Sequence, residues 1–358
     1  MPSRYRALPK VELHRHAEGA LRPETLWEFH QREAQTLYPS FDALKAAVTI
    51  PVGECPGFNA FLARFNALYF RYGNIKALER VAQEFIADAA DDTIVYVEMR
   101  FSPAFFARRM KDNPSGGWMN QPPEPREIAE EVAEAMIAAA RAEATRRGIH
   151  VNFILTLGRH FRLAGNLPQA ELLDRPIGKE FCGVDLAGFE AIPAAEFRPI
   201  FDAWRNRGGI TIHAGEDPHG PGAANVREAI DELHATRIGH GVRAGEDPEL
   251  LKRLAEQKVV LEMCPTSNLQ THACASWAAY PLKKFLDAGV RVTINTDDPA
   301  ISQITLSDEY SRLAEECGVT QEELRRCALN GAEAGFLDVE KKAELKVCVE
   351  RGWGAEDQ

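Results

Sequence analysis

The stretch VELHRH (11–16) is an apolar, β-rich run that ends on two histidines separated by one residue. Because a strand directs residues i and i+2 to one face, His14 and His16 are expected to hold one ion together. Four later apolar runs also end on glycine or a polar side chain: VDLAG (184–188), TIHAGE (211–216), RIGHG (237–241) and TINTDD (293–298). They present His213, Glu216, His240, Asp297 and Asp298 at strand ends. Imidazoles with a carboxylate suit Zn²⁺ and leave one position for water, so the pattern predicts a metal-dependent hydrolase.

Working outward from these runs, short apolar segments alternate with amphipathic stretches along the chain. The predicted strands are 11–16, 94–101, 151–157, 182–188, 209–215, 237–240, 259–263 and 290–296. The predicted helices between them are 126–147, 195–207, 224–234, 247–257 and 280–288. Strands that alternate with helices imply a parallel sheet. Eight such units imply an α/β fold, a (β/α)8 TIM-type barrel, with its site at the carboxyl ends of the strands.

Three regions lie outside that alternation. Residues 24–90 hold two or three helical stretches, and we interpret them as an insertion that covers the barrel mouth as a lid. Residues 113–125 are rich in glycine and proline and predict a surface loop. Residues 306–347 predict extra carboxyl-terminal helices that pack on the barrel. The length is compatible with a single domain over 1–358.

Composition excludes several classes of protein. The chain is 45% hydrophobic and 27% charged, as globular proteins are. Its net charge is −11 without a block of Lys or Arg, which argues against a nucleic-acid binder. No run reaches the roughly 18 apolar residues of a membrane helix, and no signal-peptide pattern opens the sequence. The seven cysteines are scattered and lack a CxxC pair, so we expect reduced thiols in a cytoplasmic protein.

Several candidates have a second interpretation. The pair His14 and His16 could belong to a strand with one satisfied and one exposed histidine. His240, between two glycines, could be a turn histidine. An aspartate ahead of Pro299 is also a common helix N-cap. The remaining histidines are interpreted as surface or helix residues without a role: 30, 150, 160, 219, 234 and 272.

The whole constellation resembles the adenosine deaminase family of metal-dependent deaminases, over nearly the full chain. The matching motifs, in order, are PKVELHRHAEGALRPETL (9–26), YVEMRFSP (96–103), DLAG (185–188), HAGE (213–216), RIGHG (237–241), LEMCPTSNLQT (261–271) and TINTDDP (293–299). The resemblance implies an α/β barrel with one zinc per chain. It implies as zinc ligands His14, His16, His213 and Asp297.

The same resemblance implies roles around the purine. Glu216 would protonate N1 as water adds at C6, and His240 would orient the attacking hydroxide. Asp298 would hydrogen-bond N7, and the backbone N–H of Gly188 would reach N3. A lid helix would cover the base with two aromatic side chains of AFLARF (60–65), Phe61 and Phe65.

The chain departs from the family pattern at two positions. Glu18 stands where adenosine-specific members usually carry an aspartate that bonds the ribose 5′-hydroxyl, and Phe189 follows DLAG in place of aspartate. Relatives that act on free adenine or on 5′-modified nucleosides often carry glutamate at the first position. The run CPTSN (264–268) and the two lid phenylalanines instead favour a nucleoside. Glu18 could also be a first-turn carboxylate that stabilises a helix start.

These observations predict a zinc-dependent aminohydrolase of an adenine nucleoside, with adenosine as the first candidate. The alternatives are a deaminase of a 5′-modified adenosine such as aminodeoxyfutalosine, or of free adenine. A barrel hydrolase of an ester or amide is more remote, because such enzymes often use two metals with a bridging Lys or carboxylate, and no lysine stands at a plausible strand end. A non-catalytic relative is disfavoured because every catalytic position is filled. The expected partner is a small purine nucleoside, and neither a nucleic acid nor a membrane is expected to bind. The sequence indicates no oligomeric state.

Overall fold

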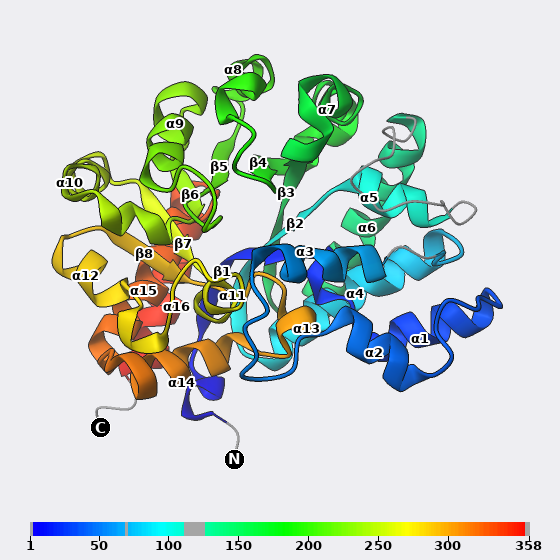
Figure 1. The fold of residues 1–358 in the computed structure, drawn as a ribbon, viewed down its shortest axis with the longest axis horizontal. Coiled ribbons are helices and arrows are strands. Elements are labelled where there is room, and N and C mark those ends of the chain that lie inside the picture. The colour runs from blue at the N-terminus through cyan, green and yellow to red at the C-terminus, as the bar shows by residue number, and fades with distance from the viewer. Residues whose placement is uncertain (1–2, 69–70, 111–125, 355–358) are drawn as a thin grey trace.

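Eight parallel strands form the centre of the molecule, in the sequential order β1 to β8 (Figure 1). The computed structural model describes residues 3–68, 71–110 and 126–354. The strands are β1 (Lys10–His16), β2 (Ile94–Phe101), β3 (His150–Gly158), β4 (Phe181–Ala187), β5 (Gly209–Ala214), β6 (Arg237–His240), β7 (Val260–Met263) and β8 (Arg291–Ile294). A parallel bridge between Arg15 and Asp297 joins β1 to the chain just after β8. The predicted (β/α)8 fold is therefore confirmed, with all eight strands near their predicted positions.

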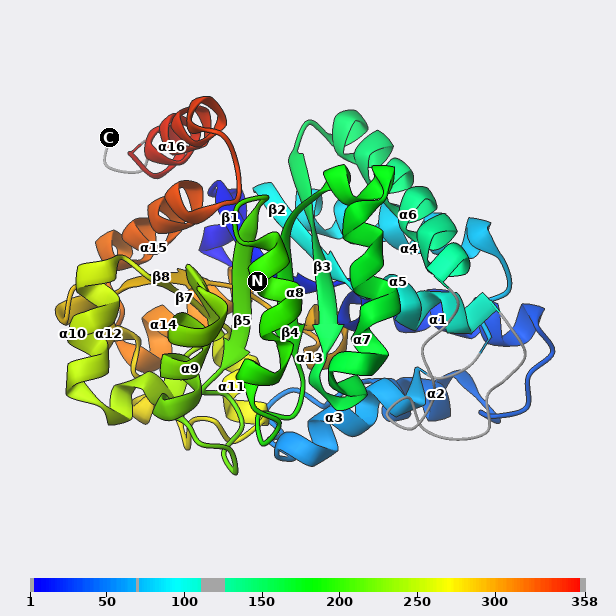
Figure 2. The ribbon, with the colours of Figure 1, turned by 90° about the horizontal axis from the view of Figure 1, so that it is seen from above.

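Helices surround the strands (Figures 1 and 2). Those up to the seventh strand are α1 (Pro23–Arg32), α2 (Phe41–Val48), α3 (Phe58–Ala67), α4 (Ile75–Asp91), α5 (Pro103–Ala107), α6 (Arg126–Arg147), α7 (Arg162–Ala170), α8 (Arg198–Trp204), α9 (Ala223–Leu233) and α10 (Pro248–Gln257). Those that follow are α11 (Pro265–Gln270), α12 (Leu282–Asp287), α13 (Pro299–Ser302), α14 (Leu306–Cys317), α15 (Gln321–Ala334) and α16 (Val339–Gly354). The five predicted helices are present, although the segment 195–207 is divided between a 3₁₀ turn (Ala194–Phe197) and α8.

The segment between β1 and β2 holds more helices than predicted. The prediction of two or three was wrong, because the described part of 24–90 contains α1, α2, α3 and α4. Helix α4 packs against β2 and α6, so it is the regular crossover helix of the first βα unit. The extra elements are therefore α1 to α3. The loop predicted at 113–125 lies outside the described residues.

The predicted carboxyl-terminal helices are present, and they pack where β8 meets β1. Helix α15 contacts both β8 and β1, and α16 lies along α15, orange and red in Figure 2. Capping boxes start α14 at Thr305 and α15 at Thr320, each with an acidic residue three positions later. In the described part of the chain, no helix has both the length and the apolar character needed to cross a bilayer.

The barrel interior beneath the strand ends is ionic. Buried Glu262 of β7 accepts a hydrogen bond from Arg100 of β2 at 2.6 Å, and its other oxygen lies 2.6 Å from Arg237 of β6. Arg100 also donates to Asp185 of β4 at 3.2 Å. Because a buried charge is costly without a partner, these pairs fix the relative positions of four strands. They form a rigid base below the polar strand ends.

Candidate active site

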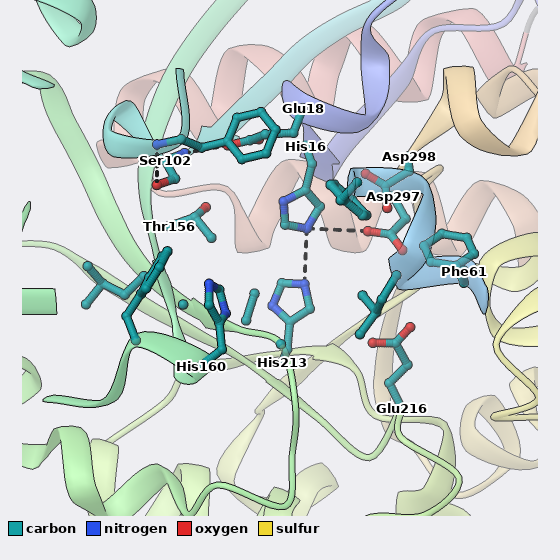
Figure 3. Close-up of a pocket in the computed structure, with 18 of the residues that line it drawn as sticks. His16, Glu18, Phe61, Ser102, Thr156, His160, His213, Glu216, Asp297 and Asp298 are labelled. Carbon is teal, nitrogen blue, oxygen red and sulfur yellow. Dashed lines mark hydrogen bonds and ion pairs between the residues drawn. The ribbon is translucent and has the colours of Figure 1, made fainter. Parts of the chain in front are cut away.

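Three strand ends bring together a compact group of metal-ligating side chains: His14, His16, His213 and Asp297. The Nε2 atoms of His16 and His213 lie 3.1 Å apart. An oxygen of Asp297 lies 3.2 Å from His14 Nε2. The same oxygen lies 3.4 Å from His16 Nε2 (Figure 3). All four ligand atoms lie within 4.8 Å of one another and all four residues are buried. The parallel barrel thus collects residues nearly 300 positions apart at one point.

Buried carboxylates fix the tautomers of two of these histidines. Glu262 lies 2.9 Å from His14 Nδ1, and Asp185 lies 2.9 Å from His213 Nδ1. Each carboxylate accepts the Nδ1 proton, so each ring in its neutral form directs the Nε2 lone pair into the cluster. Metal-ligating histidines are held in this way in proteins.

The donor set fits a metal ion. Burial lowers the pKa of His16 and His213, which keeps both rings neutral. A neutral His213 with its proton on Nδ1 has a bare lone pair on Nε2, and this atom faces His16 Nε2. Two ring nitrogens this close repel each other when both present lone pairs. A cation bound between the rings would instead be attracted to both nitrogens. Three imidazoles and a carboxylate match a tetrahedral site or a five-coordinate site that includes water.

A carboxyl group and a fourth histidine stand beside the cluster. Glu216 follows β5, and its Oε2 lies 3.3 Å from Nε2 of His240 at the end of β6. Burial raises the pKa of Glu216 well above its usual range, and the negative charges of Asp297, Glu190 and Asp217 raise it further. Glu216 is therefore suited to hold a proton at neutral pH and to donate it.

The orientation of His240 follows from its neighbours. Tyr280 donates its hydroxyl proton to the Asn268 side-chain oxygen at 3.0 Å, so the Asn268 amide nitrogen faces His240 Nδ1, at 2.9 Å. That amide donates, His240 Nδ1 accepts, and the ring proton belongs on Nε2. His240 therefore presents an N–H donor to the cavity. Its φ of 63° is a backbone conformation that few non-glycine residues adopt.

Asp298 also faces the cavity. It is buried, and its Oδ1 has no hydrogen-bond partner among the described residues. Burial raises the pKa of Asp298, with further contributions from Asp297, Glu18 and Glu216. The N-cap interpretation was wrong for its side chain, because Asp298 precedes α13 without making a cap hydrogen bond. A Cβ atom at Gly19 would lie 1.7 Å from Asp298 Oδ1, so only glycine fits beside this carboxyl group.

Apolar side chains form the opposite wall. Helix α3 contributes Phe58, Phe61, Leu62 and Phe65. Gly188, with φ of 99°, lines the cavity at the end of β4. The empty volume, open solvent at the mouth included, is about 890 Å³.

Glu18 follows the end of β1 and is buried. Its Oε1 accepts a hydrogen bond from the backbone N–H of Ser102 at 2.7 Å, which ties the end of β1 to the end of β2. The side chain lines the cavity from a short 3₁₀ turn (Glu18–Ala20). Glu18 therefore agrees with both interpretations of the sequence, because it begins a helical turn and also lines the cavity.

Comparison with known proteins agrees with this geometry. The family model described as adenosine deaminase matches residues 9–351. Adenosine deaminase from Vibrio parahaemolyticus is 37% identical over 344 residues, with 95% of this chain and 96% of the relative covered. Adenosine deaminase from Aliivibrio fischeri is 37% identical over 360 residues, with 96% and 98% covered. This chain belongs to the adenosine deaminase family. It is an aminohydrolase, and its family is metal-dependent.

Two solved structures share the fold of this family member along almost the whole chain. Adenine deaminase from Arthrobacter aurescens has a TM-score of 0.83 and 25% identity, with 96% of this chain and 99% of the other covered. An amidohydrolase from Burkholderia ambifaria with bound Zn has a TM-score of 0.83 and 25% identity, with 98% and 92% covered.

One buried residue of this deaminase family member was missed in the sequence. The Glu190 carboxylate accepts hydrogen bonds from the backbone N–H groups of Gly215 and Glu216, each at 2.7 Å, and of Asp217 at 3.0 Å. Asn225 donates to it at 2.7 Å. Glu190 therefore holds the loop that carries Glu216. Its signal was available, since it is the acid two positions after the DLAG glycine.

The prediction that His160 is a surface or helix residue was wrong, because the residue lines the cavity. His160 lines the cavity next to Gly188, and its Nδ1 would lie 3.6 Å from a Cβ atom at that glycine (Figure 3). Burial and the neighbouring Arg108 guanidinium lower the pKa of His160 to about 3, so the ring is neutral at pH 7. Arg108 and Thr156 line the same part of the cavity. Nothing in the spacing of these residues indicated that they would meet.

Proposed function

We propose that this chain is a zinc-dependent hydrolytic deaminase that converts the 6-amino group of an adenine nucleoside to 6-oxo, with adenosine giving inosine and ammonia. The observation that carries the proposal is the pair Glu216 and His240. An acid with a raised pKa and an N–H donor stand 3.3 Å apart, directly beside the cluster of three imidazoles and a carboxylate. Family membership and the named adenosine deaminases at 37% identity support the same substrate class.

The metal would be held by His14, His16, His213 and Asp297. Zinc, when bound, supplies a Lewis acid that lowers the pKa of water to about 7. Three imidazoles and a carboxylate favour zinc over the hard, oxygen-preferring cations. The zinc-containing amidohydrolase with the same fold supports this choice.

The chain's own residues would then donate the proton and stabilise the developing charge. Addition of water at C6 places electron density on N1, and Glu216 would donate its proton there. The His240 Nε2–H would stabilise the developing charge on the oxygen. The remaining proton of the added water would then pass to the amino nitrogen, the C6–N bond would break, and ammonia would leave as the 6-oxo group forms. Asp298 would bond N7 and Gly188 N–H would bond N3.

The apolar wall would protect this chemistry. We propose that α1 to α3 form a lid on a single domain, and that Phe61 and Phe65 cover the base. Exclusion of water strengthens every polar contact inside the site and helps to keep Glu216 protonated. The free, scattered cysteines support a cytoplasmic location.

The extent of the cavity favours a nucleoside over the free base. Glu18, Ser102 and Thr156 also line the cavity. A ribose would offer hydroxyl groups to these polar side chains, whereas a bare purine would not. The adenine deaminase among the structural relatives keeps free adenine as the second candidate.

The test is a substrate comparison on metal-analysed enzyme. We expect about one zinc per chain and a higher kcat/KM for adenosine and 2′-deoxyadenosine than for adenine, followed by ultraviolet absorbance and ammonia release. Full activity without metal, or two metals per chain, would contradict the zinc proposal. A preference for adenine would contradict the substrate.

A further inference from the structure

The short segment after β8 has to place two carboxyl groups at once. Asp297 belongs to the metal-ligating cluster, and Asp298 lines the cavity beside it. Asp297 has a φ of 64°, in the left-handed region that few non-glycine residues adopt. A backbone conformation of this kind costs free energy and persists only where the surrounding contacts fix it. The contacts that fix this segment therefore determine where both carboxyl groups lie.

Contacts from β1 and α11 hold Asp297 itself. Its N–H donates to the carbonyl of His14 at 3.0 Å, and its carbonyl accepts from the N–H of His16 at 2.9 Å. The Ser267 hydroxyl donates to Asp297 Oδ2 at 2.8 Å. These bonds fix one residue of the segment, and the direction in which the chain enters it depends on the preceding residue, Thr296.

Thr296 is held by a buried carboxylate of β1. The Glu12 side chain is fully buried, and its Oε1 accepts both the backbone N–H of Thr296, at 2.9 Å, and the Thr296 hydroxyl. Its Oε2 lies 3.4 Å from Nη1 of Arg15. The Arg15 guanidinium in turn lies 4.6 Å from the centre of the Phe85 ring of α4. Glu12 thus links the segment after β8 to the packing of α4 on the barrel.

From this chain of contacts we infer that Glu12 is a positioning residue of the deamination site, which acts through Thr296 on Asp297 and Asp298 together. The inference rests on the proposed function, which gives Asp297 its metal and Asp298 its bond to purine N7. Glu12 is not among the described residues that line the cavity, so its effect has to pass through Thr296. A misplacement of about 1 Å at a reacting centre can cost about 10²-fold in rate.

Asp92 provides a matched comparison for a role in stability alone. It is also a buried carboxylate, and it accepts both the N–H of Ser307, at 2.9 Å, and the Ser307 hydroxyl. Ser307 belongs to the first turn of α14, and none of the residues of α14, all of which the structure describes, lines the cavity. Asp92→Asn should therefore lower the melting temperature without moving the site.

The experiment measures two properties that a general loss of stability would not change. The first is zinc affinity, from competition with a chelator. The second is the ratio of kcat/KM for adenosine to kcat/KM for 7-deazaadenosine, which carries a C–H group in place of N7. Glu12→Gln is the test variant, because its amide nitrogen cannot accept a hydrogen bond and faces a donor, whether from Thr296 or from Arg15.

We expect Glu12→Gln to lower zinc affinity by about tenfold, as the loss of a partner outside the ligand shell does. The preference for adenosine should fall by about three- to tenfold, which is the contribution of one hydrogen bond. Thr296→Val removes the hydroxyl and keeps the backbone N–H, so it should lower both values by less. This variant also provides the test if Glu12→Gln does not fold. Asp92→Asn should keep both values.

The outcomes separate this inference from the proposed function. Zinc affinity and adenosine preference that stay unchanged in Glu12→Gln, or that fall equally in Asp92→Asn, would overturn the inference and leave the proposed function intact. If the unmodified protein deaminates neither nucleoside, the proposed function fails, and the zinc competition still decides whether Glu12 positions Asp297. Equal kcat/KM for both nucleosides in the unmodified protein would overturn the part of the inference that concerns Asp298.

Discussion

The two ends of the cavity are built from different parts of the chain. At the metal end, His14, His16 and His213 lie on barrel strands, and buried carboxylates hold two of the rings by 2.9 Å hydrogen bonds. At the far end, Phe65 and Arg108 come from the helix α3 and from a 3₁₀ turn after α5. Strand ends of a barrel are fixed by both neighbouring strands, whereas helices outside the barrel are fixed by packing alone. The chemistry thus belongs to the part of the fold that is fixed most firmly, whereas the aromatic wall belongs to helices and turns outside the barrel.

This contrast can be tested by the size of mutational effects, since changes at the metal end should cost far more activity than changes at the aromatic wall.

Glu216→Gln should cause the largest loss of activity. The amide keeps the shape but cannot donate a carboxyl proton to N1, and proton transfer contributes about 10²–10⁴-fold. We expect kcat to fall by at least this factor while metal content and melting temperature stay the same. Near-normal turnover would reject Glu216 as the acid.

The pH profile gives a second measurement on the same residue. The protonated form of Glu216 is the active one, and its pKa is raised by burial first and by Asp297 next. Activity should therefore be retained above the ordinary carboxyl range and should fall as pH rises through the raised pKa. Glu216→Gln should lack that alkaline limb.

Glu190 tests whether the metal end depends on precise positioning. Glu190→Ala removes the acceptor for the N–H groups of Gly215, Glu216 and Asp217, so the Glu216 loop should shift. A misplacement of about 1 Å can cost about 10²-fold, so we expect kcat to fall about ten- to hundredfold with KM less affected.

Two further variants separate positioning from general destabilisation. Glu190→Gln keeps one acceptor oxygen and should restore part of kcat. Glu228→Ala is the matched control, because Glu228 accepts hydrogen bonds from the backbone N–H groups of Ala194 and Ala195, at 3.1 Å each. Neither of these bonds involves the Glu216 loop. Equal loss of kcat in Glu190→Ala and Glu228→Ala would mean that Glu190 acts only through stability.

Sequence alone was sufficient for most of the metal end. A parallel barrel places every strand's carboxyl end on one face, so the order of the strands was enough to predict that His14, His213 and Asp297 would meet. The tautomers could not be predicted, because they depend on Glu262 and Asp185, whose directions inside the barrel follow from packing.

The far end could not be predicted for the same physical reason. His160 and Arg108 follow β3 and β2 in loops and short helices, and the path of such segments is set by tertiary contacts. Nothing local distinguishes a histidine in the cavity from one on the surface. At the metal end, by contrast, Glu190 had a local signal, because it stands two positions after the strand-end glycine Gly188.

Asp185 tests the support of the ligand histidines. Asp185→Asn weakens the acceptor for the His213 Nδ1 proton, and loss of such a partner typically costs about 10–100-fold in metal affinity. We expect this loss in a chelator competition, with activity restored by excess zinc. Glu309→Gln is the control. Glu309 is equally buried, its pKa is raised to about 8 by burial, and it bonds Thr266 rather than a histidine. Equal zinc affinity in all three proteins would remove Asp185 from the site.

Phe61→Ala should have the smallest effect on catalysis and tests the aromatic wall. Phe61 is 2% exposed and packs with Ile50 and Ile301, so the variant loses stability as well as a contact with the base. Leu68→Ala is therefore the control, because Leu68 is equally buried at the end of α3 but does not line the cavity.

If the wall strengthens the polar contacts that form during reaction, Phe61→Ala should weaken the binding of a hydrated-purine inhibitor more than the binding of adenosine. The expected difference is about two- to tenfold, which corresponds to about 0.5–1.5 kcal/mol for an aromatic contact. Leu68→Ala should weaken neither. Equal weakening of both ligands by Phe61→Ala would mean that the wall binds ground state and transition state alike, and that selective stabilisation resides entirely at the metal end.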